Sequence, residues 1–266
     1  MRKSHKILSI IALLSGSAFL FFYEKNNDSD TSEPTLAPIS ENKPDISAIT
    51  DTKTKKQTFF GYLRPGIVIE NARIVKERER LLAMKNALDE QSLSSEQIAT
   101  AKRMGKLYSL EPSEVTYEWI DNMLKRVDVL PEALVLTQAA NESAWGTSRF
   151  AREANNYFGQ WCYTKGCGLV PLQRSEGKTH EVAKFDSPQG SIHGYFMNVN
   201  RNRAYQELRD IRASIRDKGQ DPASETAALE LSNGLLRYSE RGEAYVKDLQ
   251  AMIRHNEEFW ILNNKI

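Results

Sequence analysis

Residues 129–146 form an apolar helix pattern with a carboxylate near its end, and this combination sets the strongest condition on the fold. Pro131 suits the first turn of such a helix, because a residue there does not need its N–H for a helical hydrogen bond. Gly146 is placed to end the helix. At helical spacing, the turns behind Glu142 are formed by Leu134, Val135, Gln138 and Ala139. The pattern therefore predicts a helix whose last turn carries a partly desolvated Glu142.

Desolvation of Glu142 has a chemical consequence. It raises the pKa of a carboxyl group, which keeps the group protonated near neutral pH and able to donate a proton. Cleavage of a glycosidic bond requires such a proton donor. The same spacing also fits a buried Glu that pairs with an Arg, or a helix end that lies close to solvent.

The N-terminus has the pattern of an export signal. A basic start over residues 1–6 is followed by an apolar run over residues 7–23. The run is near the lower limit for crossing a bilayer, roughly 17–25 residues. Residues 16–18 offer a small-residue cleavage site, but more apolar residues follow it. We therefore expect residues 1–23 to form an uncleaved anchor that leaves the rest of the chain outside the cytoplasm. A cleaved signal peptide is the less favoured alternative.

Composition divides the rest of the chain into three parts. Residues 24–58 are polar and nearly lack large apolar side chains, which predicts a disordered linker. Residues 59–128 are expected to form a helical preface, and residues 129–266 the main domain. The charge balance of 36 basic and 35 acidic residues gives no indication of a nucleic-acid partner.

The chain has two cysteines, Cys162 and Cys167. In an exported protein this pair is expected to form a disulfide that closes a short turn. A metal site would need further ligands at close spacing, and His180 and His193 are scattered, so no metal is expected.

The order of patterns along the chain predicts an α+β fold. Helices are expected over residues 67–87, from the capping box at 94–97 to 108, from 112 onward, and over 189–200, 205–215, 223–236 and 244–259. Ser187 is expected to cap the helix over residues 189–200. Between these helices, residues 157–185 are rich in aromatic residues and glycines, which predicts a small β-hairpin lobe. A mainly helical lobe and a hairpin lobe would have a cleft between them.

A basic stripe, formed by Arg209, Arg212 and Arg216, lies on one face of the helix expected over residues 205–215. It would attract anionic polymers if it were free. Because acidic residues alternate with these arginines, we expect a solvated face with salt bridges instead.

Four segments in order resemble the bacterial glucosaminidases of glycoside hydrolase family seventy-three, including the flagellar FlgJ type. They are the helix end at 138–146 (QAANESAWG), the step at 156–159 (NYFG), the return at 184–187 (KFDS) and the paired-Tyr segment at 238–245 (YSERGEAY). The match spans roughly residues 130–255. The whole chain, its N-terminal segment included, is similar to an enterobacterial member of that family.

The resemblance implies a lysozyme-like fold and an endo-β-N-acetylglucosaminidase of peptidoglycan that acts in the periplasm without a cofactor. Glu142 then corresponds to the general acid, and Tyr238 to a residue that supports the second half of the reaction. The remaining matched residues imply contacts with the glycan or a role in shaping the cleft: Trp145, Asn156, Phe158 and Tyr245. Packing in the core is an equal alternative for Trp145 and Phe158.

The resemblance leaves the second catalytic carboxylate open. Glu176 lies at the predicted hairpin turn and Glu181 on the return strand. We prefer Glu176, because a Glu at a turn can reach across a cleft and position a water molecule. An inverting mechanism, a retaining mechanism and attack by the sugar's own acetamido group all remain open.

Two other functions fit the same sequence. A lytic transglycosylase also needs an acidic Glu at the position of Glu142. A non-catalytic module that binds glycan in the periplasm would use the same fold without the chemistry.

Overall fold

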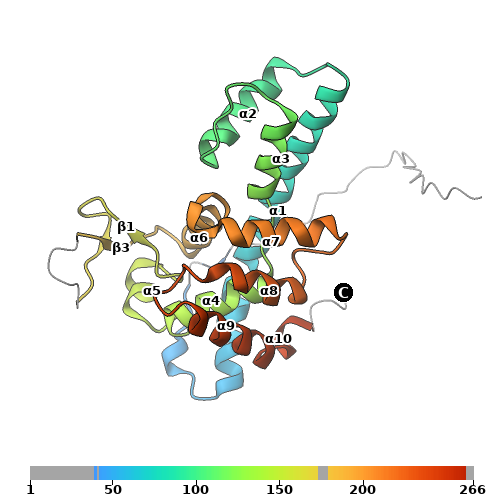
Figure 1. Cartoon of the computed structure of the whole chain (residues 1–266). Helices are drawn as coiled ribbons and strands as arrows, with labels where there is room; N and C mark the ends of the chain where they lie inside the picture. Colours follow the sequence, from blue (N-terminus) through green and yellow to red (C-terminus); the bar gives the residue numbers. More distant parts are fainter. Residues whose placement is uncertain (1–38, 41, 173–178, 262–266) are drawn as a thin grey trace, which may run out of the picture. The chain divides into compact units, whose positions relative to one another are not determined.

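The computed structural model describes residues 39–40, 42–172 and 179–261, which form a mainly helical fold with one small sheet (Figure 1). The helices of more than one turn in the first half are α1 (Thr52–Asp89), α2 (Ser95–Leu107), α3 (Tyr117–Arg126), α4 (Glu132–Ser143) and α5 (Arg149–Ala154). Those in the second half are α6 (Pro188–Arg201), α7 (Gln206–Asp217), α8 (Glu225–Ser232), α9 (Glu243–His255) and α10 (Glu258–Ile261). The predicted α+β class is confirmed, and the arrangement agrees with the lysozyme-like fold that the resemblance implies.

Helix α1 begins earlier than the sequence pattern indicates. Asp51 caps it by accepting a hydrogen bond from the backbone N–H of Thr54 at 2.7 Å. Residues before the helix also pack against the rest of the fold, because Ile39 and Ile46 are buried in the core. The predicted disordered linker over residues 24–58 is therefore wrong for its described C-terminal end. The pattern missed this because the helix is held by tertiary burial of Phe59 and not by local periodicity.

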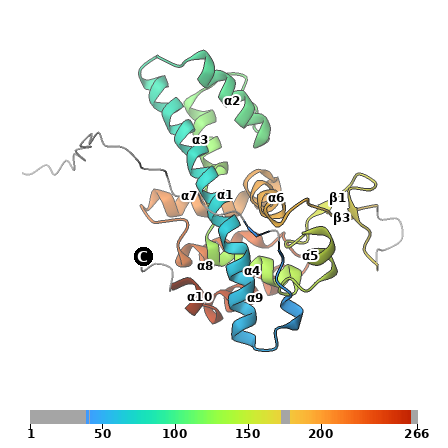
Figure 2. The ribbon, with the colours of Figure 1, turned by 180° about the vertical axis from the view of Figure 1, so that it is seen from behind.

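Helices α2 and α3 lie beside the C-terminal half of α1, as Figure 2 shows from behind. The predicted capping box is confirmed, since the side chains of Ser94 and Gln97 each accept a hydrogen bond from the other's backbone N–H. Helix α3 begins at Tyr117 behind its N-cap Thr116, five residues later than expected. The core is continuous from α1 to α10, so the predicted preface and main domain share it.

Helix α4 is buried on nearly every side, against α1, α8 and α9. It ends before Gly146, because Ala144 already adopts a left-handed conformation with φ of 49°. Trp145 and Gly146 follow with φ of 59° and 77°. Three successive left-handed residues turn the chain sharply and leave Glu142 in the final helical turn.

The predicted small β-lobe is a three-stranded antiparallel sheet in the order β1-β3-β2. Its strands are β1 (Trp161–Cys162), β2 (Gly168–Leu169) and β3 (Glu181–Ala183). The predicted disulfide between Cys162 and Cys167 is confirmed and closes the loop that joins β1 to β2. Helix α6 follows, with Ser187 as its predicted N-cap.

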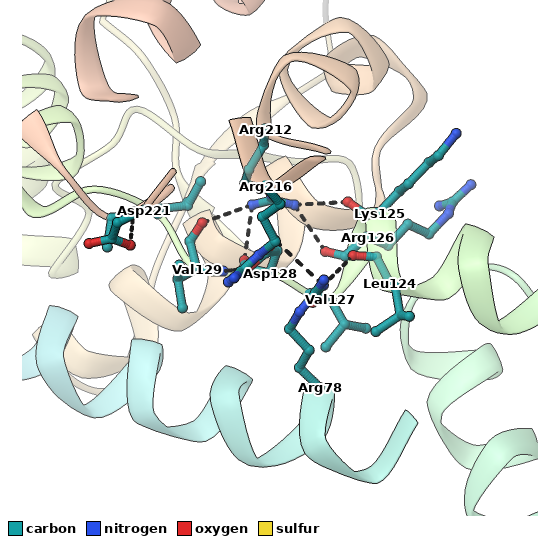
Figure 3. Close-up of polar contacts among 12 residues, drawn as sticks. Arg78, Leu124, Lys125, Arg126, Val127, Asp128, Val129, Arg212, Arg216 and Asp221 are labelled. Carbon is teal, nitrogen blue, oxygen red and sulfur yellow. Dashed lines mark hydrogen bonds and ion pairs between the residues drawn. The ribbon is translucent and has the colours of Figure 1, made fainter. Parts of the chain in front are cut away.

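The expectation for the basic stripe on α7 is wrong. Arg209 and Arg212 are fully buried instead of solvated. Arg212 donates hydrogen bonds of 2.9–3.2 Å to the backbone carbonyls of Lys125, Arg126, Asp128 and Val129 (Figure 3). Arg216 forms a two-fold contact with the Asp128 carboxylate at 2.5 and 2.6 Å. Arg209 donates to the backbone carbonyls of Val199 and Asn202, both at 2.8 Å. The stripe is therefore structural, because it joins α7 to the C-terminal end of α6 and to the connection between α3 and α4.

Within the described ranges, no helix combines the length and the apolar character needed to cross a membrane. The predicted anchor over residues 1–23 lies outside the described residues.

Candidate active site

Glu142 is half-buried in the last turn of α4. Its Oε1 accepts hydrogen bonds from the hydroxyl of Tyr245 at 2.9 Å and from Nδ2 of Asn141 at 3.2 Å. Its Oε2 faces Gly159, where an added Cβ would lie 3.4 Å away. Among the described residues no basic side chain forms an ion pair with Glu142. The alternative of a Glu–Arg pair therefore finds no support in this part of the chain.

The surroundings of Glu142 raise its pKa. Burial disfavours the charged carboxylate and is the largest influence on this pKa. The hydrogen bonds from Tyr245 and Asn141 act in the opposite direction, because they stabilise the carboxylate, but they do not offset burial. Glu142 therefore keeps its proton to a higher pH than an exposed Glu, as expected from its sequence context.

A chain of hydrogen bonds fixes the direction of the Tyr245 hydroxyl. The buried hydroxyl of Tyr195 donates to Oε1 of Gln138, which orients the Gln138 amide. Nε2 of Gln138 then donates to the Tyr245 oxygen at 3.0 Å. Because that oxygen accepts from Gln138, its own proton is directed at Glu142.

Tyr238 lies next to this chain. Its ring stacks on that of Tyr245, with a centroid distance of 5.6 Å and an interplanar angle of 6°. Its hydroxyl donates to the backbone carbonyl of Phe158 at 2.7 Å. Phe158 is buried and stacks on Tyr195 at 4.3 Å. Four of the residues matched by the resemblance, Glu142, Phe158, Tyr238 and Tyr245, are thus brought together, and Phe158 contributes a packed ring.

Asn156 and Trp145 contact the scaffold. Asn156 is buried, and its Nδ2 donates to the carbonyls of Gln160 and Ala183, both at 2.9 Å. It therefore holds the segment around Gly159 against β3. Trp145 packs on two buried rings of α1, those of Phe59 and Phe60, at 5.7 and 5.3 Å. The ring contacts of Trp145 and Phe158 agree with the alternative that these two residues pack in the core.

Glu181 occupies a buried position on β3. Its two carboxylate oxygens accept hydrogen bonds from the backbone N–H groups of Gly166 at 3.0 Å and Gly168 at 2.9 Å. These contacts tie the disulfide-closed loop to the sheet and fit a structural role better than a catalytic one. Glu176, the preferred second carboxylate, lies outside the described residues.

We expect Glu181→Gln to act on stability and not on catalysis. An amide offers one oxygen in place of two, so one of the backbone N–H groups loses its acceptor, at a cost of about 1–3 kcal/mol. Thermal unfolding should show a lower Tm, while the rate of fragment release from cell-wall sacculi at a temperature well below Tm stays within a few-fold of wild type. An unchanged Tm combined with a large loss of rate would assign Glu181 to the chemistry instead.

A cavity of about 330 Å³ opens beside Gly146 and Thr147, between α1 and the segment at residues 43–47. Its lining does not include Glu142, so this cavity is not the candidate active site.

The sequence pattern identifies Gln138 only as a position behind Glu142. Its role in orienting Tyr245 was missed, as was the contribution of Tyr195. A signal was available for Gln138, because a polar residue one turn before Glu142 on an otherwise apolar helix face needs a buried partner. No comparable signal marked Tyr195, whose contact spans 57 residues of sequence.

The sequence of this chain matches a known protein family. Residues 117–258, more than half of the chain, match the family model Glucosaminidase, described as mannosyl-glycoprotein endo-beta-N-acetylglucosaminidase. The chain belongs to this family, which confirms the resemblance to glycoside hydrolase family seventy-three, and it is a glycoside hydrolase of the peptidoglycan glucosaminidase type.

Individual relatives extend the comparison beyond the family domain. The chain is 32% identical over 220 residues to "Protein bax" of Escherichia coli (strain K12), a match that covers 82% of this chain and 76% of the relative. It is also similar to a solved structure of a type VI secretion system effector-immunity complex from Pseudomonas protegens. That match has 22% identity and covers 59% of this chain and 89% of the other. Its TM-score of 0.28 is too low to support a statement about the fold.

Proposed function

We propose that this chain is an endo-β-N-acetylglucosaminidase that cleaves the β-1,4 bond between N-acetylglucosamine and N-acetylmuramic acid in peptidoglycan, with Glu142 as the general acid. One observation carries the proposal: the Glu142 carboxyl is desolvated, receives an oriented hydroxyl from Tyr245 and has no basic partner among the described residues. A glycosidase needs a carboxyl group in this state.

The contacts of Glu142 suit both its protonated and its ionised form, which alternate during the proposed reaction. As the bond between the sugar's C1 and the glycosidic oxygen breaks, the Glu142 proton moves to the leaving oxygen and a carboxylate remains. The Tyr245 hydroxyl donates to that carboxylate at 2.9 Å and stabilises it. Tyr238 is proposed to support the second half of the reaction, after its hydroxyl leaves the Phe158 carbonyl. The second group that activates water, or the acetamido group that replaces it, stays open.

The proposed location follows from the substrate. Peptidoglycan lies outside the cytoplasm, and the basic and apolar pattern of residues 1–23 is that of an export signal. We propose that this segment anchors the chain to the inner membrane, with its catalytic part in the periplasm. Cleavage of the segment would instead release the chain into the periplasm.

End-group analysis of the products tests the proposed bond. Purified sacculi are digested with the full chain, the fragments are reduced with borohydride, and mass spectrometry identifies the terminal sugar. Reduced N-acetylglucosamine ends are expected. Anhydro-muramic ends would instead show a lytic transglycosylase, and reduced muramic ends would show cleavage of the other bond. Binding to sacculi without any release would support a non-catalytic glycan-binding module.

We expect Tyr245→Phe to shift the pH dependence of catalysis. The Tyr245 hydroxyl stabilises the Glu142 carboxylate and so lowers the Glu142 pKa, which means that its removal raises that pKa further. Since the general acid works only when protonated, the alkaline limb of kcat/KM should move to higher pH. Tyr117→Phe is the matched control, because its hydroxyl bonds Asp89 on the surface at 2.7 Å. An alkaline limb that stays in place or moves to lower pH would contradict this account of Tyr245.

A further inference from the structure

The β-lobe exposes large apolar side chains that no packing requirement explains. Trp161 keeps 55% of its surface exposed and Tyr163 73%, and Val170 and Leu172 are also exposed. A Trp is usually well buried, and a group of exposed apolar residues commonly marks a binding surface. In both ribbon views the sheet that carries Trp161 lies next to α5 (Figures 1 and 2).

Trp161 is held in one orientation. Its indole stacks on the imidazole of His180, with a centroid distance of 4.1 Å and an interplanar angle of 13°. Its backbone pairs with Val182 in the sheet, and the next residue, Cys162, is fixed by the disulfide. Because His180 covers one face of the indole while 55% of the residue's surface stays exposed, we infer that the opposite face of the indole is turned to solvent. The result is a flat aromatic surface on the edge of the β-lobe.

This aromatic surface is close to the candidate active site along the chain. Gly159 lies two residues before Trp161, and a Cβ on Gly159 would be 3.4 Å from Oε2 of Glu142. Two residues of extended chain span at most about 7 Å. The polypeptide that passes the Glu142 carboxyl therefore continues directly into the strand that carries Trp161, whose Cα lies at most about 7 Å from that of Gly159.

We propose that the Trp161–His180 pair is a sugar-binding platform, on which a pyranose ring of the glycan strand stacks while a neighbouring bond is positioned at Glu142. In a β-1,4-linked amino sugar the ring substituents are equatorial, so each ring face presents axial C–H groups that pack well on an aromatic plane. Burial of apolar surface combined with polar groups at the edges is typical of such sites. The inference rests on the proposed function and names a positioning site for its substrate.

A lipid surface is the competing occupant for exposed aromatic residues. The structure favours a glycan, because the indole is stacked on His180 and belongs to the strand that begins two residues after Gly159, which contacts the proton donor. Insertion into a membrane requires neither of these features.

Tryptophan fluorescence tests the platform without depending on turnover. The full chain with Glu142→Gln is titrated with soluble peptide-free glycan strands while acrylamide quenches the emission. Of the four tryptophans, Trp119 and Trp260 are buried and Trp145 is partly buried, so quenching reports mainly on Trp161. We expect glycan to protect against quenching, and we expect protection to disappear in the same background with Trp161→Phe.

Affinity measurements by calorimetry complete the test in the same background. Trp161→Ala should weaken glycan binding at least tenfold and Trp161→Phe less, because Phe keeps a smaller aromatic face. Tyr117→Ala is the matched control, since Tyr117 is also an exposed aromatic residue but lies at the start of α3, outside the β-lobe, and this variant should bind within twofold of the parent. Thermal unfolding checks each fold, and Trp161→Phe provides the test if Trp161→Ala does not fold.

Three results would overturn the platform: equal glycan affinity for Trp161→Phe, Trp161→Ala and the parent, no glycan binding by the parent, or protection of Trp161 by phospholipid vesicles but not by glycan. Failure of the platform and failure of the proposed function remain distinct. Release of N-acetylglucosamine ends by wild type together with unchanged binding by the Trp161 variants would reject only the platform. Glycan protection of Trp161 without any cleavage by wild type would reject only the hydrolase.

Discussion

Replacement of Glu142 by Gln should lower the rate of fragment release from sacculi by about 10³-fold, the middle of the range for loss of a general acid. A Gln amide has nearly the same shape as the Glu carboxyl but cannot donate its proton to the glycosidic oxygen. The contacts with Tyr245 and Asn141 are few and lie at a half-buried helix end, so the Tm should stay within a few degrees of wild type.

The matched control for this variant is Glu207→Gln, which makes the same change on the exposed face of α7. Its rate should equal that of wild type. Full activity of the Glu142→Gln chain would exclude Glu142 as the acid, and its failure to fold would show that Glu142 has a structural role.

Replacement of Arg212 by Met should cause the largest loss of stability, about 3 kcal/mol or more in the free energy of unfolding. Arg212 is fully buried and donates to four backbone carbonyls (Figure 3). Two of these, at Lys125 and Arg126, are at the C-terminal end of α3, where helical carbonyls have no partner within the helix. Met fills similar space but leaves all four acceptors without this donor.

Equilibrium unfolding in urea measures this loss. Arg241→Met is the control, because the Arg241–Asp248 pair is exposed and such pairs contribute about 1 kcal/mol or less. Since Arg212 also binds the carbonyls of Asp128 and Val129, just before α4, its loss should reduce activity through the position of Glu142. A loss of stability no larger than that of the control would contradict this account of the α7 arginines.

Local signals in the sequence were sufficient for several elements of the fold. The capping box at Ser94 and Gln97, the N-cap at Ser187 and the Cys162–Cys167 pair each depend on residues a few positions apart. Short separations of this kind leave few alternatives, and all three predictions are confirmed.

Features that depend on distant partners were not predictable in the same way. The stripe on α7 alternates with acidic residues and resembles a surface, but Arg212 finds its acceptors 83–87 residues earlier in the chain. The early start of α1 depends likewise on burial of Ile46 and Phe59 in a shared core. Periodicity within one segment carries no information on such partners.

In the candidate site too, the features that depend on nearby residues were predictable and those that depend on distant residues were not. The apolar turns before Glu142 predicted its desolvation, and the structure shows the pKa raised by burial. The direction of the Tyr245 hydroxyl depends on Gln138 and Tyr195, which come from two other helices. Only the folded chain brings these groups together.

The protonation state of Glu142 can be measured by titrating its carboxyl group. The full chain is labelled with ¹³C at the glutamate side-chain carboxyl carbons, and NMR spectra are recorded across the acidic and neutral pH range. The signal that is missing in Glu142→Gln identifies Glu142. Because burial outweighs the hydrogen bonds from Tyr245 and Asn141, this signal should titrate above the ordinary range of glutamate carboxyls. A midpoint at or below that range would contradict the account, since Glu142 would then have lost its proton at the pH where it must donate it.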